Sequence, residues 1–214
     1  CKSGHYNLCP DVVFLATPPV QGCNEEYIAF PENMCFKLPD NVSTKEGALI
    51  EPLSVGFYAS EQGGVKTGDT VVILGSGCIG LVTLLACKED ALKKIEELTN
   101  GRGADVVFET AGSPVTIAQT PFIVRRGGVI TLVGISAKEE INYNFAQIMD
   151  KEATIKSLFR YRNIYPKAIA AVSGGAINVK GIVTHEFDLD HIQEAYDEAV
   201  NNKTDLVKAV IKVK

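Results

Sequence analysis

The chain has 214 residues, with 21 basic and 26 acidic side chains and a formal net charge of −5. Hydrophobic residues make up 46% of the sequence and charged residues 22%, a composition that excludes a disordered chain and indicates a folded core. No long run of Lys or Arg occurs, so we expect no nucleic-acid partner.

The apolar segments and the cysteines indicate the compartment. The longest uncharged stretch, residues 71–87, contains three glycines and is shorter than the roughly 18 apolar residues of a membrane span. No charged segment followed by an apolar stretch and a cleavage site opens the sequence at Cys1. The six cysteines show no C-x-x-C spacing. We therefore expect a cytoplasmic protein with no membrane partner.

The first half of the chain changes character near residue 68. Residues 1–53 are rich in Pro and Gly with short apolar bursts, which predicts all-β or loop-rich structure. Residues 70–74 are a β-branched apolar run that predicts a strand, and residues 79–87 predict a helix. Residues 91–98 have the apolar spacing of an amphipathic helix, which Asn100-Gly101 would end.

The second half alternates strands with helices. We predict strands at 105–108, 129–133, 154–159 and 206–213, with helices at 115–124, 166–172 and 191–201. The strand at 129–133 would start from Arg125-Arg126-Gly127-Gly128. Because the early strands are almost wholly apolar, they predict an α/β fold with a parallel sheet covered on both faces.

A glycine-rich turn connects the first predicted strand to its helix. Gly75-Ser76-Gly77-Cys78-Ile79-Gly80 has the G-x-G-x-x-G spacing, and this context favours binding of a dinucleotide pyrophosphate. Gly75 would permit the tight turn, Gly77 the approach of a phosphate, and Gly80 close packing of helix on strand. The alternative is a glycine-rich turn that binds nothing.

The expected second strand of a dinucleotide fold is missing from the pattern. Such a fold has an Asp or Glu about 20 residues after the turn, which selects NAD over NADP. Here that position lies near Thr99, after a charged helix. At least one strand and one helix are therefore absent, and the choice between NAD and NADP stays open.

Several ordered segments together resemble the zinc-containing medium-chain dehydrogenases, and within them the polyol dehydrogenases. This resemblance implies a Rossmann-type doubly wound parallel sheet plus a GroES-like, mostly β catalytic domain. It places parts of the catalytic domain at 1–54 and 159–214 and an incomplete NAD-binding domain at 55–158. The segments that carry it are residues 1–9, 16–19, 37–42 and 47–56, the glycine-rich turn, and Phe159-Arg160-Tyr161.

The sequence departs from the family in two places. The family begins with a segment that supplies a Cys and a His-Glu pair to the catalytic zinc, and nothing here corresponds to it. The match also breaks after Cys87, where the family has an acidic second strand and further elements. Either these segments belong to the protein and are omitted here, which we expect because deleting interior strands would expose unpaired backbone, or the molecule is truly shortened.

The resemblance assigns metal ligands to three residues. Glu51 matches the glutamate beside the catalytic zinc, which contacts the metal directly or through water. Cys1 and Cys9 match the last pair of the structural-zinc motif C-x2-C-x2-C-x7-C, although many polyol dehydrogenases have lost that site. Without the family, Glu51 would be interpreted as a surface glutamate before a proline. The spacing of Cys1 and Cys9 would by itself be only a weak indication of a metal site. The three histidines, His5, His185 and His191, are too scattered to form a ligand cluster.

The resemblance also assigns substrate and cofactor contacts. The residues that match substrate-pocket positions are Phe14, Thr17, Arg160 and Tyr161. Without the family, Phe14 and Thr17 would be interpreted as core residues, and Arg160 and Tyr161 as part of a solvated strand end. Val133, Gly134 and Ile135 match the nicotinamide floor. The cofactor contacts are then Gly75, Gly77, Cys78, Ile79, Gly80, Val133, Ile135, Phe159 and Arg160.

The expected activity follows from these assignments. The resemblance implies a zinc-dependent oxidoreductase that passes hydride from a secondary alcohol of a polyol, such as sorbitol or xylitol, to NAD and yields the ketose. The alternatives are a threonine or butanediol dehydrogenase-like enzyme, or an inactive dinucleotide-binding remnant. The family also implies a homodimer or homotetramer that pairs near residues 130–141.

Overall fold

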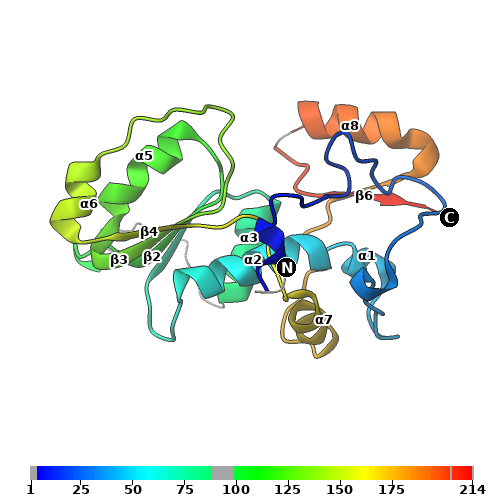
Figure 1. Ribbon diagram of the computed structural model, residues 1–214, viewed down its shortest axis with the longest axis horizontal. Helices are drawn as coiled ribbons and strands as arrows, with labels where there is room; N and C mark the ends of the chain where they lie inside the picture. Colours follow the sequence, from blue (N-terminus) through cyan, green and yellow to red (C-terminus); the bar gives the residue numbers. More distant parts are fainter. Residues whose placement is uncertain (1–3, 88–98, 203, 214) are drawn as a thin grey trace. The chain divides into compact units, whose positions relative to one another are not determined.

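The structure is a computed structural model that describes residues 4–87, 99–202 and 204–213. Contacts divide it into two compact units (Figure 1), which are Glu51–Ile164 and the combination of Cys1–Ile50 with Tyr165–Lys214. The assignment of 1–54 and 159–214 to a catalytic domain, and of 55–158 to a cofactor domain, stays a prediction.

The unit Glu51–Ile164 is built on a parallel sheet of four strands. The strands are β1 (Val71–Leu74), β2 (Ala104–Glu109), β3 (Val124–Leu132) and β4 (Thr154–Ser157), paired in the order β1-β2-β3-β4. The register places Val71 beside Val106 and Ile130 beside both Val107 and Ile155. Every residue of β2 is buried, as expected for a strand between two others with both faces covered. The predicted parallel α/β fold is confirmed.

Helices cover both faces of this sheet. On one face, α5 (Pro114–Ile123) and α6 (Phe145–Lys151) pack on β2 and β3, with Ile148 in a core beside Val107 and Ile130 (Figure 1). On the other face, Ala59 of α2 (Ile50–Gly63) packs against Val106 and Phe108 of β2. A further helix, α3 (Cys78–Cys87), packs on β1.

Close approach of two helices requires a glycine in this unit. A Cβ at Gly56 of α2 would lie 2.6 Å from the backbone oxygen of Val82 in α3. The two backbones therefore touch where a side chain would otherwise separate them.

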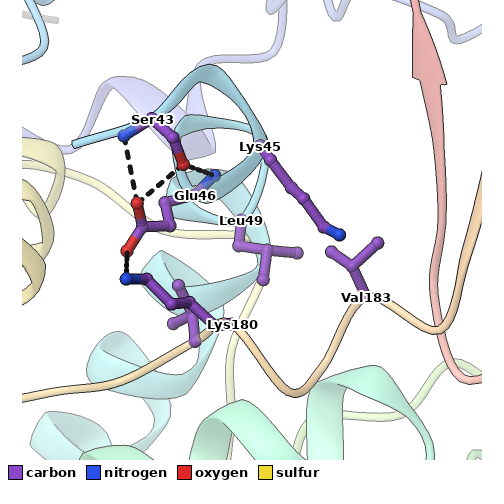
Figure 2. A pocket seen from close by; sticks show the side chains of 7 residues that line it. Ser43, Lys45, Glu46, Leu49, Lys180 and Val183 are labelled. Carbon is purple, nitrogen blue, oxygen red and sulfur yellow. Dashed lines mark hydrogen bonds and ion pairs between the residues drawn. The ribbon is translucent and has the colours of Figure 1, made fainter.

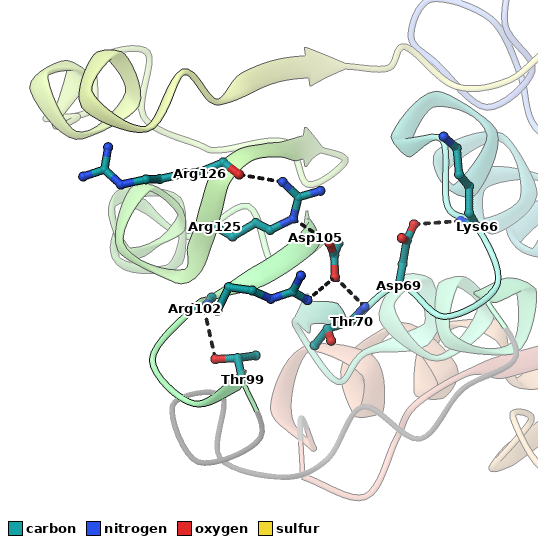
Figure 3. Close-up of polar contacts among 9 residues, drawn as sticks. Lys66, Asp69, Thr70, Thr99, Arg102, Asp105, Arg125 and Arg126 are labelled. Atoms are coloured by element: carbon teal, nitrogen blue, oxygen red, sulfur yellow. Dashed lines mark hydrogen bonds and ion pairs between the residues drawn. The ribbon is translucent and has the colours of Figure 1, made fainter.

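A buried carboxylate fixes the start of β2. Asp105 accepts hydrogen bonds from the backbone N–H of Thr70 at 2.9 Å and from Arg102 at 2.8 Å, and it pairs with Arg125 of β3 (Figure 3). Burial alone would raise the pKa of Asp105, but the Thr70 hydrogen bond and the two guanidinium groups outweigh it and hold the pKa below its usual 3.8. The segment before β1 and the start of β3 are both tied to this one side chain.

The expected and observed elements of this unit differ in three respects. Helices α2 and α6 were not predicted, and β3 begins at Val124 rather than at residue 129. The early start includes an irregular register between Ala104 and Val106 and a positive φ of 67° at Gly127, so the Arg-Arg-Gly-Gly segment lies within the strand. The predicted helix at 91–98 lies outside the described residues.

The other unit combines the two ends of the chain. Its helices are α1 (Thr44–Gly47), α7 (Tyr165–Ser173) and α8 (Ile192–Asn201), with single 3-10 turns at Tyr6–Leu8, Glu32–Met34 and Leu189–His191. Two short strands, β5 (His185–Asp188) and β6 (Ala209–Lys212), form a parallel pair. Asn41 joins the two ends, because its side chain bonds both the carbonyl and the hydroxyl of Ser173 in α7, at 2.9 Å each.

The N-terminal part is loop-rich and not all-β. Within the described residues 4–49 there is no strand, since the apolar bursts make local bonds instead, such as Ala16 N–H to Gln21 O at 2.9 Å. Several large apolar side chains of this segment are exposed, and Tyr27 is 88% exposed. A strand needs a neighbouring strand to pair its backbone groups, and in the part of the chain that the structure describes no strand pairs with residues 4–49.

The described ranges 4–87, 99–202 and 204–213 contain no helix that combines the length and hydropathy of a membrane span.

Candidate functional site

The glycine-rich turn lies at the carboxyl ends of β1 and β2, where an open parallel sheet binds ligands. Gly75 has a φ of +130°, and a Cβ there would lie 2.4 Å from the hydroxyl of Thr110. A Cβ at Gly80 would lie 2.1 Å from the carbonyl oxygen of Gly75. Glycine is therefore required at both positions, as the sequence predicts for a tight turn and for a helix packed closely on it.

Gly77 differs from the other two glycines because nothing lies within 4 Å of the place where its Cβ would be. Its neighbours Cys78 and Ile79, which are half-buried, begin the ten-residue helix α3. Open space over a glycine backbone beside the N-terminus of such a helix is the geometry that accepts a pyrophosphate. The residues present therefore fit a dinucleotide.

Thr110 fastens the end of β2 to the glycine-rich turn. Its backbone N–H and its hydroxyl both donate to the carbonyl oxygen of Leu74, at 2.9 and 3.1 Å. Because Leu74 precedes Gly75, these two bonds fix the point at which the turn begins.

A fully buried carboxylate, Glu109, ends β2. Its Oε1 accepts hydrogen bonds from the N–H groups of Ala111 and Gly112, both at 3.1 Å, and from the hydroxyl of Thr116 at 2.7 Å. Its backbone carbonyl accepts from the N–H groups of Val133 and Gly134, at 2.8 and 2.9 Å. The sequence assigned Glu109 no role, although a carboxylate directly after the apolar residues 106–108 is a signal that could have identified it.

The predicted nicotinamide floor follows β3. Val133 is half-buried, while Ile135 is 87% exposed. Gly134 packs against the loop after β2, because a Cβ on it would lie 2.2 Å from the N–H nitrogen of Gly112. These residues follow β3 and the glycine-rich turn follows β1, so both lie at the carboxyl edge of the sheet, with the end of β2 between them.

The predicted contacts after β4 also belong to this unit. The Arg160 guanidinium lies 5.5 Å from the centre of the Phe159 ring, in a cation–π arrangement. Arg160 has a φ of +57°, a conformation uncommon for a residue with a side chain. Phe159 is exposed, and Arg160 and Tyr161 are half-buried.

The remaining predicted site residues lie apart in sequence. Glu51 is exposed in the first turn of α2, whereas Phe14, Thr17 and Cys9 belong to the unit that combines the chain ends. Phe14 and Cys9 are half-buried, Thr17 is exposed, and Cys1 lies outside the described residues.

The zinc prediction lacks a complete ligand set. In the part of the chain that the structure describes, no group of three or more His, Cys, Asp or Glu side chains could hold a metal ion. Four-coordinate zinc takes three or four protein ligands. The described residues therefore supply no complete zinc site, and we derive no step through a zinc ion.

A small hollow of about 190 Å³ lies in the unit of the chain ends, over the apolar side chains of Leu49, Val179 and Val183. The charges at its rim are already paired, as Figure 2 shows for Glu46, which bonds Ser43 and lies 3.9 Å from Lys180. These Ser43 bonds, together with Lys180, lower the pKa of Glu46. Ligand pockets usually measure about 300–1,000 Å³, so this hollow is not the candidate site.

Comparisons with known proteins identify the family of this chain. The family model described as "Zinc-binding dehydrogenase" matches residues 79–174. An "Uncharacterized zinc-type alcohol dehydrogenase-like protein YdjJ" of Escherichia coli is 42% identical, with 100% of this chain aligned to 71% of that protein. A sorbitol dehydrogenase of Bacillus subtilis is 37% identical, with 99% of this chain aligned to 69% of that protein.

Solved structures give the same result. A crystal structure of an oxidoreductase/dehydrogenase of unknown specificity from Escherichia coli superposes with a TM-score of 0.93 at 42% identity, covering 100% of this chain and 71% of the other. A 2R,3R-butanediol dehydrogenase of Bacillus subtilis superposes with a TM-score of 0.87 at 28% identity, covering 98% and 70%.

The length of one alignment bears on the missing segment. The alignment with the zinc-type protein of Escherichia coli runs over 247 positions, whereas the chain has 214 residues, so at least 33 positions of that relative stand opposite gaps. The resemblance seen in the sequence is confirmed, including its partial extent. The chain belongs to the zinc-binding medium-chain dehydrogenase family of alcohol and polyol dehydrogenase-like oxidoreductases.

Proposed function

We propose that the protein is an NAD-dependent polyol dehydrogenase that oxidises a secondary alcohol of a polyol of the sorbitol or xylitol type to the ketose. The observation that carries this proposal is the glycine-rich turn, with open space over Gly77 and obligatory glycines at positions 75 and 80. The sorbitol dehydrogenase of Bacillus subtilis, 37% identical, supports the substrate class.

The chain's own residues bind and orient the cofactor in this proposal. The turn lets the pyrophosphate approach Gly77, and the N-terminus of α3 favours its negative charge. Val133 and Ile135 support the nicotinamide, with Phe159 and Arg160 beside it. Held by these residues, NAD would supply the hydride acceptor for the carbinol carbon, with the hydroxyl proton released to solvent.

Arg160 and Tyr161 are proposed substrate residues, because a guanidinium and a phenol suit hydroxyl recognition. The family resemblance adds Phe14 and Thr17 as further proposed substrate residues. Glu51 is the proposed residue of the catalytic zinc site. The described residues do not supply the other ligands of that site.

Two other functions are open to test. A butanediol or threonine dehydrogenase-like specificity is supported by the likeness to the butanediol dehydrogenase of Bacillus subtilis, although at the lower identity of 28%. An inactive dinucleotide-binding remnant is the function expected if the segments missing from this sequence are truly deleted.

The experiment is a substrate panel that follows formation of NADH at 340 nm. Sorbitol, xylitol, 2,3-butanediol and threonine are each tested with NAD and with NADP, and intact mass is measured on the same sample. We expect turnover of the polyols with NAD. Reaction of only the simple diol or the amino acid would refute the polyol assignment, and binding of NADH without turnover of any substrate would identify the remnant.

The proposal extends to assembly and compartment. We propose a homodimer or homotetramer, for which light scattering is the test. The free thiols of Cys9, Cys23 and Cys35 support a reducing cytoplasm as the compartment.

A further inference from the structure

Glu109 is the one fully buried carboxylate among the described residues, and it belongs to none of the predicted contacts. A carboxylate taken out of water needs compensation from a cation or from hydrogen bonds. In the described part of the chain no Lys, Arg or His side chain forms an ion pair with Glu109. Backbone N–H groups and one hydroxyl compensate it instead.

The donors to this carboxylate all come from one segment. Ala111, Gly112 and Thr116 span the loop after β2 and the first turn of α5, whose N-cap is Ser113. The partial positive charge at the N-terminus of a ten-residue helix adds to the hydrogen bonds. The side chain of Glu109 therefore sets the course of the loop between β2 and α5.

That loop is interlocked with the segment after β3. A Cβ on Gly112 would lie 2.4 Å from the carbonyl oxygen of Ile135, and a Cβ on Gly134 would lie 2.9 Å from Glu109 Oε2. The backbone carbonyl of Glu109 also holds the N–H groups of Val133 and Gly134. A shift of the loop thus moves the Val133–Ile135 segment, because neither contact leaves free space.

From this arrangement we propose that Glu109 is a positioning residue for the nicotinamide end of the cofactor. It holds the loop after β2 against the segment Val133–Ile135, and so acts through that segment. The inference rests on the proposed function, in which Val133 and Ile135 support the nicotinamide. Thr110, the next residue, separately fixes the turn that receives the pyrophosphate.

The proposal predicts a difference between the two ends of the dinucleotide. Loosening Val133–Ile135 weakens the contact with nicotinamide, while the glycine-rich turn, held by Thr110, keeps its shape. NADH contains the nicotinamide and ADP-ribose lacks it, so the two ligands report on the two ends separately. A general loss of structure would weaken both.

The experiment measures the dissociation constants of NADH and ADP-ribose by calorimetry on the full chain. The variants are Glu109→Gln and Thr116→Val, with Thr116→Ser as the conservative rescue and the exposed Glu139→Gln as matched control. In Glu109→Gln the amide oxygen can take the place of Oε1, but the NH2 group then faces the Gly112 N–H that Oε2 accepts at 3.2 Å. Two donors meet there and the negative charge is lost, so we expect the Kd for NADH to rise about tenfold. The Kd for ADP-ribose should change less than about twofold. Thr116→Val should show a smaller shift of the same kind, which Thr116→Ser reverses.

Hydrogen exchange without any ligand tests whether Glu109 holds the loop after β2 against the segment Val133–Ile135. We expect faster amide exchange at Gly112 and Gly134 in Glu109→Gln and no change in Glu139→Gln. Unchanged NADH affinity, or an equal loss for both ligands, would overturn the positioning role while leaving the proposed function intact. A wild-type chain that binds neither ligand would overturn the proposed function and the cofactor role of Glu109 together. This would hold even if hydrogen exchange shows that Glu109 keeps the loop after β2 against Val133–Ile135.

Discussion

Replacing Asp105 by Asn tests the electrostatic anchor of the sheet (Figure 3). Oδ2 of Asp105 accepts from Thr70 N–H and from Arg102, and Oδ1 accepts from Nε of Arg125. An Asn side chain that keeps its oxygen toward Thr70 must turn its NH2 group toward Arg125. Two donors then face each other where a buried ion pair was.

The magnitude follows from the exposure of each partner. The pair with Arg102 adds little, since that side chain is 56% exposed and such pairs contribute about 0–1 kcal/mol. The Arg125 side chain is 31% exposed and donates a charge-assisted hydrogen bond to the nearly buried Asp105 carboxylate. Loss of this bond costs about 1.5–3 kcal/mol. We expect Asp105→Asn to lower the free energy of unfolding by about 2 kcal/mol, which corresponds to a Tm lower by roughly 4–8 °C.

The assay is urea unfolding at a series of pH values, with Asp150→Asn as the matched control. Asp150 pairs with Arg126, but both side chains are exposed, at 59% and 71%, so its substitution should cost about 0–1 kcal/mol. The pKa of Asp105 is lowered by folding, so its contribution is present above its usual 3.8 and is lost as pH falls through the folded value. The difference between wild type and Asp105→Asn should therefore shrink on acidification. A cost equal to that of Asp150→Asn, or one that grows as pH falls, would refute this reasoning.

Two further substitutions separate binding from stability. Gly77→Ala should leave Tm unchanged, because its Cβ meets nothing within 4 Å, yet weaken NADH binding by calorimetry; Gly80→Ala should impair both, because its Cβ would lie 2.1 Å from a carbonyl oxygen. Equal Tm losses for the two variants would contradict the difference between the open space at Gly77 and the close contact at Gly80. Lys151→Met should lower the free energy of urea unfolding by about 1–3 kcal/mol, because its ammonium bonds the carbonyls of Pro121, Phe122 and Val124 at the end of α5. A neutral result would show that water replaces the ammonium there.

The sheet strands and the cofactor turn could be predicted because their information is local. Residues 71–74 form a strand, as the β-branched apolar run predicts, and residues 78–87 form a helix, as the absence of helix-breaking residues from 79 to 87 predicts. A strand buried on both faces is mostly apolar, so the sequence predicts the parallel α/β fold. The glycines at 75 and 80 could also be predicted from the motif, because neighbouring atoms lie too close to either position for any residue with a Cβ.

Other elements depended on contacts between distant segments. The capping box formed by Ser43 and Glu46 is a local signal for α1. In α2, by contrast, Gly56 is explained only by its close approach to Val82 of α3, a contact that the local sequence does not show. The early start of β3 likewise requires a partner, because Val124 pairs with Ala104 across an irregular register. Local patterns do not encode such partners.

Glu109 shows most clearly what was decided at each level. The sequence by itself determined that a carboxylate follows the apolar residues 106–108 and that a glycine, Gly112, comes three residues after it. Only the tertiary structure decided that this carboxylate is buried, that it is compensated by loop N–H groups, and that Gly112 meets the segment after β3. The physical reason is that burial and hydrogen bonding depend on which segments are brought together in space, whereas a residue's backbone preferences are its own.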